Sequence, residues 1–280
     1  MSRYRVAHTT GFKYSREVSA SYNEARLLPA RDDRQFVIAS KLDIQPQSAS
    51  HEYLDYFKSR AVQFEILEPH DELTIQATSL VEIRDSIRAV PGLNWDDLAP
   101  EVVSSLELTD AIGQTRRTQP PAELNKFAKK VAAQFGPHEA AMEVCKKVFG
   151  AMAYKHGVTG VHSVATEAWS AKIGVCQDYA HITLGALRAA GIPARYVSGY
   201  LHPHIAPKVG EKVIGESHAW VEWWAGSWYA YDPTNDIEIG ERHIVVASGR
   251  DYDDVAPLRG VYAGAGESEL FVTVEITKEA

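Results

Sequence analysis

One segment in the second half of the chain constrains the fold more than any other. Residues 177–190 are apolar on nearly every side, and Gly191 and Pro193 end the run. A helix of this kind is buried, and a glycine followed closely by a proline is a common helix stop. The segment therefore predicts a buried helix that begins directly after Gly174-Val175-Cys176.

The predicted helix begins with a cysteine and without an ordinary cap. Val175 and Cys176 are poor N-cap residues. A cysteine in the first turn lies at the positive end of the helix dipole, beside unpaired backbone N–H groups, and both features stabilise a thiolate. Cys176 is therefore a candidate nucleophile. On position alone, a small buried cysteine of the core is an equally good interpretation.

The composition argues against several classes of protein. The 280 residues are 45% hydrophobic, enough to bury a sizeable core in one large or two smaller domains. The net charge of −8 argues against sequence-independent binding to nucleic acid. No apolar run approaches the roughly 20 residues that cross a membrane, and no apolar signal segment follows Met1. We therefore expect a cytoplasmic protein without nucleic-acid or membrane partners, and the oligomeric state stays open.

The second cysteine has a different setting. Residues 139–152 carry apolar side chains at helical spacing, and Cys145 lies on that apolar stripe. We expect Cys145 to belong to the core. A chain of this length with two cysteines does not depend on disulfides, which fits a reducing compartment.

The first part of the chain has the pattern of strands. Three segments alternate apolar and polar residues with a period of two: 41–44, 61–66 and 73–83. Short strands separated by turn residues predict a β-sandwich domain over residues 1–90, in which we find no catalytic cluster. A second domain, with helices and strands, is predicted over residues 91–280. The expected fold class is therefore α+β.

Two strands joined by a short turn bring a histidine and an aspartate together. Residues 217–224 and 228–232 predict strands, with Gly226 in the three-residue turn between them. A loop of three residues places Asp232 diagonally across from His218 on the same face of the hairpin. A loop of two residues would place the two side chains on opposite faces.

A cysteine nucleophile needs a base within hydrogen-bond reach and a third group that orients the base, and Cys176, His218 and Asp232 offer these three. Each residue has an ordinary explanation when it is taken alone. His218 resembles many structural histidines on strands, and Asp232 precedes Pro233 as turn residues often do. Their occurrence together with Cys176 indicates catalysis.

Two other interpretations are compatible with parts of the sequence. His202 and His204 can point toward one metal ion, with His218 as a third ligand, but no acidic residue or cysteine at ligand spacing completes the set. A peptide-binding module that keeps the fold without catalysis is the second alternative, although an intact triad argues against it. We expect neither a cofactor nor a metal.

Several motifs resemble those of the bacterial transglutaminase-like superfamily. They are GVCQDYAH at 174–181, GIPARYVSGY at 191–200, SHAWVE at 217–222, DPTN at 232–235 and the C-terminal signature at 249–260. Residues 1–84 are similar to the β-domain that precedes the core in this family. The resemblance implies a papain-like core of helices and an antiparallel sheet, with Cys176 as nucleophile, His218 as base and Asp232 as orienting acid.

The resemblance also implies a reaction at an amide carbonyl through a thioester on the cysteine. We expect a peptide or protein substrate and favour hydrolysis, because water is always available and amine transfer needs a second selective site. A true protein-glutamine acyltransferase is the alternative. The oxyanion needs donors, and the candidates are the backbone N–H of Cys176 and a side chain, either Tyr154 or Trp169.

Overall fold

The chain begins with strands, continues with helices in its middle part and ends mostly with strands. The computed structural model describes residues 1–84, 92–157, 160 and 162–280. Strands come first: β1 (Ser2–Val18), β2 (Ala20–Ala25), β3 (Gln35–Gln45), β4 (Ser50–Leu54), β5 (Arg60–Ile66) and β6 (His70–Ile83). Helices and two short strands follow: α1 (Trp95–Ser104), α2 (Leu106–Ile112), α3 (Ala122–Ala132), α4 (Pro137–Ala151), β7 (Ala153–Tyr154), α5 (Ala165–Ala171), β8 (Ile173–Gly174) and α6 (Cys176–Ala189). The last elements are β9 (Ala194–Leu201), β10 (Lys212–Trp224), β11 (Trp228–Asp232), β12 (Ile237–Glu238), β13 (His243–Gly249), α7 (Tyr252–Val255), β14 (Leu258–Ala263) and β15 (Ser268–Lys278).

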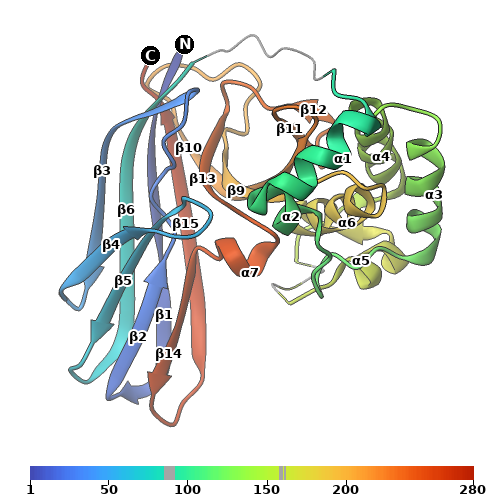
Figure 1. Ribbon diagram of the computed structural model, residues 1–280. Helices are drawn as coiled ribbons and strands as arrows, with labels where there is room; N and C mark the ends of the chain where they lie inside the picture. Colours follow the sequence, from blue (N-terminus) through green and yellow to red (C-terminus); the bar gives the residue numbers. More distant parts are fainter. Residues whose placement is uncertain (85–91, 158–159, 161) are drawn as a thin grey trace.

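The N-terminal strands form the β-sandwich that the alternating pattern predicts. One layer is the sheet β14-β2-β5-β4, and the other contains β15, β1, β6 and β3. Their inward side chains share one core, with Val62 and Phe64 from β5 packed together with Leu73 and Ile75 from β6. In Figure 1 this sandwich lies on the left and the helices lie on the right. The α+β fold class is confirmed.

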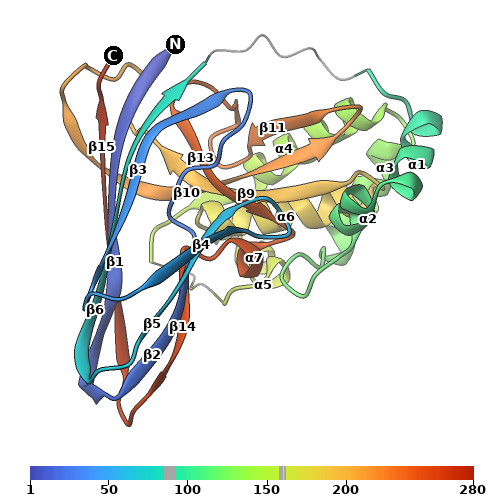
Figure 2. The ribbon, with the colours of Figure 1, turned by 60° about the vertical axis from the view of Figure 1, so that its left-hand side comes forward.

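A continuous sheet of nine strands connects the sandwich to the rest of the molecule. Its main path runs β12-β11-β10-β15-β1-β6-β3, and β9 joins it by pairing with β10 and β13. Strand β10 makes the connection because its residues 212–215 pair with β15 and its residues 216–223 pair with β9. The two ends of the chain lie side by side, as Figure 2 shows, and the N–H of Arg3 donates to the carbonyl of Ala280 at 3.0 Å.

The end of the chain therefore belongs structurally to its beginning. Strand β15 pairs with β1 along eleven residues, and β14 pairs with β2. The expected division into residues 1–90 and 91–280 stays a prediction, because its boundary lies outside the described residues. Strands β14 and β15 belong to residues 91–280 by sequence, but they pair with β2 and β1 of residues 1–90.

The helical half is organised around α6, as the sequence predicts. Every residue from 177 to 188 is buried, and the helix packs against β10 and against α3, α4 and α5. A Cβ at Gly185 would lie 1.9 Å from the carbonyl oxygen of Thr118, so the glycine lets the segment before α3 cross the helix closely. Cys145 is fully buried in the same core, which confirms that expectation. Among the described residues, no helix has both the length and the hydrophobicity needed to cross a membrane.

Candidate active site

Cys176 is the first residue of α6, and an aspartate inside the helix supplies the cap that the sequence lacks at its start. The backbone N–H of Val175 donates to Asp178 Oδ2 at 2.9 Å, and Ser163 Oγ donates to Asp178 Oδ1 at 2.6 Å. A Cβ at Gly174 would lie 2.7 Å from Asp178, so only glycine fits there without a shift. These contacts fix the backbone on which the cysteine stands.

The hairpin has the register that the three-residue turn predicts. Trp224 pairs with Trp228, and Gly226 in the turn has a φ of 97°, a conformation that favours glycine. As a result, His218 Nε2 donates to Asp232 Oδ2 at 2.7 Å. The two side chains therefore meet across the hairpin, on the face expected from the sequence.

His218 also contacts Cys176. Burial lowers the pKa of His218, but its hydrogen bonds with Asp232 and Cys176 outweigh burial and raise that pKa to about 10. His218 therefore carries a proton at neutral pH. Because its Nε2 faces Asp232, its Nδ1 is left for the sulfur of Cys176.

Asp232 is fully buried and receives several N–H groups. Its Oδ1 accepts from the backbone of Thr234 at 2.9 Å and of Asn235 at 3.3 Å, and its Oδ2 accepts from Asn235 Nδ2 at 2.7 Å. Burial raises the pKa of Asp232, but hydrogen bonds from His218 and Asn235 and the nearby imidazole of His243 hold that pKa well below its usual range. The carboxylate therefore stays ionised.

Asn235 and His243 were not among the residues singled out from the sequence. Asn235 had a local signal, since an Asp-Pro-Thr-Asn segment is typical of a turn in which the aspartate accepts backbone N–H groups. His243 had none, because it comes from β13 and reaches Asp232 only through the folding of the sheet.

The two proposed side-chain oxyanion donors have different surroundings. Tyr154 lies on β7 directly across from Gly174 on β8, two residues before the cysteine. Burial and the nearby Cys176 both raise the pKa of Tyr154, so its hydroxyl keeps its proton and can donate. Trp169 is buried in α5, and its indole N–H donates to Glu123 Oε2 at 3.3 Å.

The metal site considered for His202, His204 and His218 does not form. His202 is buried, and its Nδ1 accepts the backbone N–H of His204 at 3.2 Å. Among the described residues, one group of three side chains has the residue types and the spacing that could hold a metal ion, and it consists of His218, Asp232 and His243. His202 and His204 are not part of this group, so the alternative metal site with His218 as third ligand is not supported.

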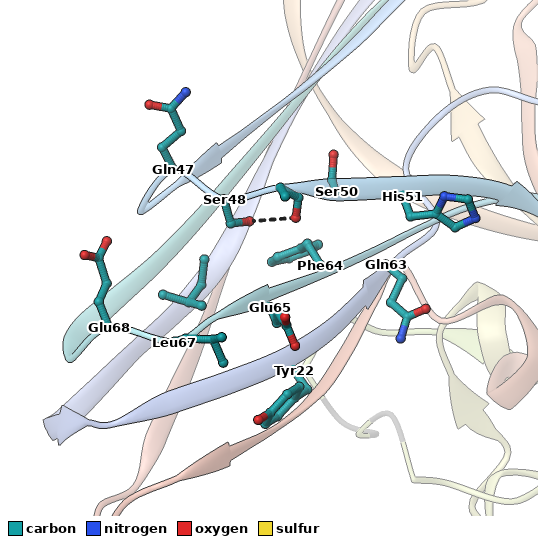
Figure 3. Close-up of a pocket in the computed structure, with 12 residues that line it drawn as sticks. Tyr22, Gln47, Ser48, Ser50, His51, Gln63, Phe64, Glu65, Leu67 and Glu68 are labelled. Carbon is teal, nitrogen blue, oxygen red and sulfur yellow. Dashed lines mark hydrogen bonds between the residues drawn. The ribbon is translucent and has the colours of Figure 1, made fainter.

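Two hollows lie away from the triad. A shallow hollow of about 800 Å³ lies on the sandwich. Figure 3 shows three of the residues that line it, Ser50, His51 and Gln63. A second hollow, of about 780 Å³, lies between residues 30–33 and 56–59 and the strands β9 to β11. Neither is lined by the triad, so we place the candidate active site at the tip of α6, where Cys176 is partly exposed.

Comparisons with known proteins find family models that match both parts of the chain. Residues 4–82 match the model of the bacterial transglutaminase-like N-terminal region, and residues 125–233 match that of the transglutaminase-like superfamily. An uncharacterised protein of Mycobacterium leprae (strain TN) is 42% identical over the full length of both chains. A protein-glutamine gamma-glutamyltransferase of Pseudomonas aeruginosa is 36% identical over 87 residues, which cover 30% of this chain and 13% of that protein.

One solved structure shows the same fold over nearly the whole chain. It comes from Cytophaga hutchinsonii and is provisionally described as a cysteine protease. The TM-score is 0.77 at 20% sequence identity, with 99% of this chain and 90% of that chain covered. At this identity the likeness concerns the fold alone.

Proposed function

This chain belongs to the bacterial transglutaminase-like superfamily, and from that premise we propose that it is a cysteine-dependent enzyme that hydrolyses a peptide or amide bond. Members of this superfamily are usually cysteine-based enzymes. The observation that carries the proposal is the chain of contacts from Cys176 through His218 to Asp232. This arrangement supplies a nucleophile, a proton carrier and a fixed negative charge in one place.

The first half of the reaction forms the thioester. The Cys176 thiolate attacks the carbonyl carbon of the substrate amide and gives a tetrahedral oxyanion. The C–N bond then breaks as protonated His218 gives its proton to the leaving amine, and the acyl group stays on the sulfur. Asp232 stabilises the imidazolium until that proton leaves.

The second half of the reaction returns the enzyme to its starting state. Water attacks the thioester carbonyl while neutral His218 accepts a proton from the water. The C–S bond breaks, a carboxylic acid leaves, and the thiolate and imidazolium are restored. No step needs a cofactor or a co-reactant other than water.

The oxyanion is stabilised in this proposal by two donors. The backbone N–H of Cys176 lies in the first turn of α6, where N–H groups have no partner inside the helix. The Tyr154 hydroxyl is the side-chain donor of choice because it stays protonated near Cys176. The indole of Trp169 is the weaker candidate, since Glu123 already accepts its N–H.

Acyl transfer to an amine is a second candidate function. It is favoured by the similarity to the Pseudomonas aeruginosa protein-glutamine gamma-glutamyltransferase over 87 residues. An amine would replace water in the attack on the thioester, and the first half of the reaction would be unchanged. We favour hydrolysis because water reaches the partly exposed Cys176 without a dedicated binding site.

A screen with glutamine-containing peptides tests both functions. The protein is incubated with each peptide, with and without a fluorescent primary amine, and the Cys176→Ala variant serves as the control. We expect release of ammonia or of a cleaved peptide in water alone, with complete loss in the control. Mass spectrometry identifies whether the product is an acid or an amide of the added amine.

The outcomes separate the candidates. Amine incorporation that exceeds hydrolysis at millimolar amine would replace the hydrolase by an acyltransferase. Binding of peptides without any product, together with an unreactive Cys176 thiol, would leave a peptide-binding module.

A further inference from the structure

A second histidine lies beside the triad carboxylate and has no part in the mechanism above. His243 is the first residue of β13, and 1% of its surface is exposed. Its Nε2 lies 3.6 Å from Asp232 Oδ2 and makes no hydrogen bond within the described residues. Its ring meets Trp220 edge to face, with the ring centres 5.4 Å apart. The imidazole is therefore held between an indole and the carboxylate of the triad.

The three side chains have the composition of a metal site. The ligand atoms of His218, Asp232 and His243 all lie within 4.8 Å of one another, and two histidines with one carboxylate bind several transition metals. A histidine that binds a metal through Nε2 carries its proton on Nδ1 and usually donates it to an acceptor. This requirement can be checked against the partner of Nδ1.

The partner of His243 Nδ1 is a donor. The backbone N–H of Gly240 donates to His243 Nδ1 at 3.2 Å, so that nitrogen must offer a lone pair. A neutral His243 then carries its proton on Nε2, where a metal would need a lone pair. The geometry thus makes Nε2 an N–H donor aimed at Asp232 and disfavours metal binding.

The surroundings of His243 keep it neutral. Burial has the largest effect and lowers the pKa of His243; Asp232 raises that pKa, and the charges of His218 and Arg242 add smaller lowering effects, so that the pKa stays below its ordinary value. The distance of 3.6 Å from His243 Nε2 to Asp232 Oδ2 is longer than that of a hydrogen bond. The N–H dipole still stabilises the negative charge of the carboxylate, because both groups are buried. His243 thus contributes a fixed dipole rather than a second positive charge.

We propose that His243 is a positioning residue of the triad, whose Nε2–H holds the Asp232 carboxylate in the orientation that receives His218. Two side-chain groups already donate to Asp232 Oδ2, one from His218 on β10 and one from nearby Asn235. His243 comes from a separate strand and ties the hairpin of β10 and β11 to β13. The proposal rests on the function proposed above, because it gives His243 a role only within that triad.

A matched pair of variants separates the two nitrogens of His243. In His243→Gln the side-chain amide nitrogen reaches about where Nε2 stands, so the donor to Asp232 is kept. In His243→Asn the side-chain oxygen reaches about where Nδ1 stands, so the acceptor for Gly240 is kept and the donor is lost. The readout is the rate at which iodoacetamide alkylates Cys176 at different pH values, measured by peptide mass mapping. Buried Cys145 serves as the internal control.

We expect the two variants to differ. Loss of the donor loosens Asp232, weakens its hold on the His218 proton and so destabilises the thiolate of Cys176. In His243→Asn the pH of half-maximal alkylation therefore rises by about half a unit or more, while His243→Gln stays close to the parent. Equal shifts in both variants, or no shift in either, would overturn the positioning role.

Two further measurements keep the test decisive. In the unaltered protein, nitrogen-15 NMR of labelled histidines reports the tautomer directly. A proton on Nδ1 of His243 contradicts the proposal, as does tight binding of added Zn²⁺ at that ring.

His218→Ala tests the function itself, because it removes the imidazolium from the thiol. If the alkylation profile of Cys176 does not respond to His218→Ala, the proposed function fails; if it responds to His218→Ala and not to His243→Asn, only the role of His243 fails.

Discussion

At the scale of single residues, the candidate chemistry depends on the buried charges of Asp232 and His218. Asp232 is fully buried and ionised, and it fixes the proton on His218 beside Cys176. These three residues were predictable because each stands in a local pattern: a helix tip, a strand and a turn. The hydrogen bond from Ser163 to Asp178 and the dipole of His243 were not, because each depends on a contact between separate segments of the chain.

Replacing Asp232 with Asn tests the charge at constant side-chain size. Burial lowers the pKa of His218, but its bonds to Asp232 and Cys176 raise it to about 10, above the ordinary 6.5. Protonated His218 therefore stabilises the fold fully below pH 6.5, and this contribution is lost as the pH rises through about 10. We expect Asp232→Asn to flatten the fall in melting temperature over this range and to lower turnover by orders of magnitude.

The control for this variant is Asp33→Asn, which removes the charge of an exposed loop residue. It should leave both the turnover and the pH profile of melting unchanged. Near-normal turnover in a folded Asp232→Asn protein would remove Asp232 from the mechanism.

At the scale of elements, the turn between β10 and β11 decides whether the triad can assemble. Side chains alternate between the two faces of a strand, so the pairing register sets which of them meet. The sequence was sufficient here because Gly226 in a three-residue loop specifies that register, and the observed pairing of Trp224 with Trp228 confirms it. The burial of α6 was equally predictable from its apolar surface.

Deleting Gly226 should separate stability from activity. The shorter turn shifts the pairing by one residue and moves either His218 or Asp232 to the opposite face. Because a surface turn tolerates small changes in length, we expect a folded protein with little activity, measured by circular dichroism melting and by trapping of the thioester. Ser227→Ala is the matched control, since this exposed position lies in the same turn and its replacement keeps both the length and Gly226. Full activity in the deletion variant would contradict the register argument.

At the scale of the whole molecule, the sandwich and the helical half share one sheet. Strand β15 lies between β1 and β10, so a strand from the end of the chain joins the two parts. The sequence did not predict this connection, because an alternating pattern shows that a strand exists and which face is apolar, but not which distant strand it pairs with. Residue pairs such as Tyr4 with Lys278 are separated by almost the whole chain.

We expect the two parts to unfold together, and the tryptophans allow a direct test. All six tryptophans lie between residues 95 and 228, so their fluorescence reports on the helical half and its sheet. Leu73 is fully buried in the sandwich core. Its replacement by Ala should cost about 2–5 kcal/mol and, through the shared sheet, lower the fluorescence-detected melting temperature by several degrees. Leu67→Ala, at a side chain that is 61% exposed, is the control and should change little. If Leu73→Ala leaves the fluorescence-detected melting temperature unchanged, the two halves unfold independently.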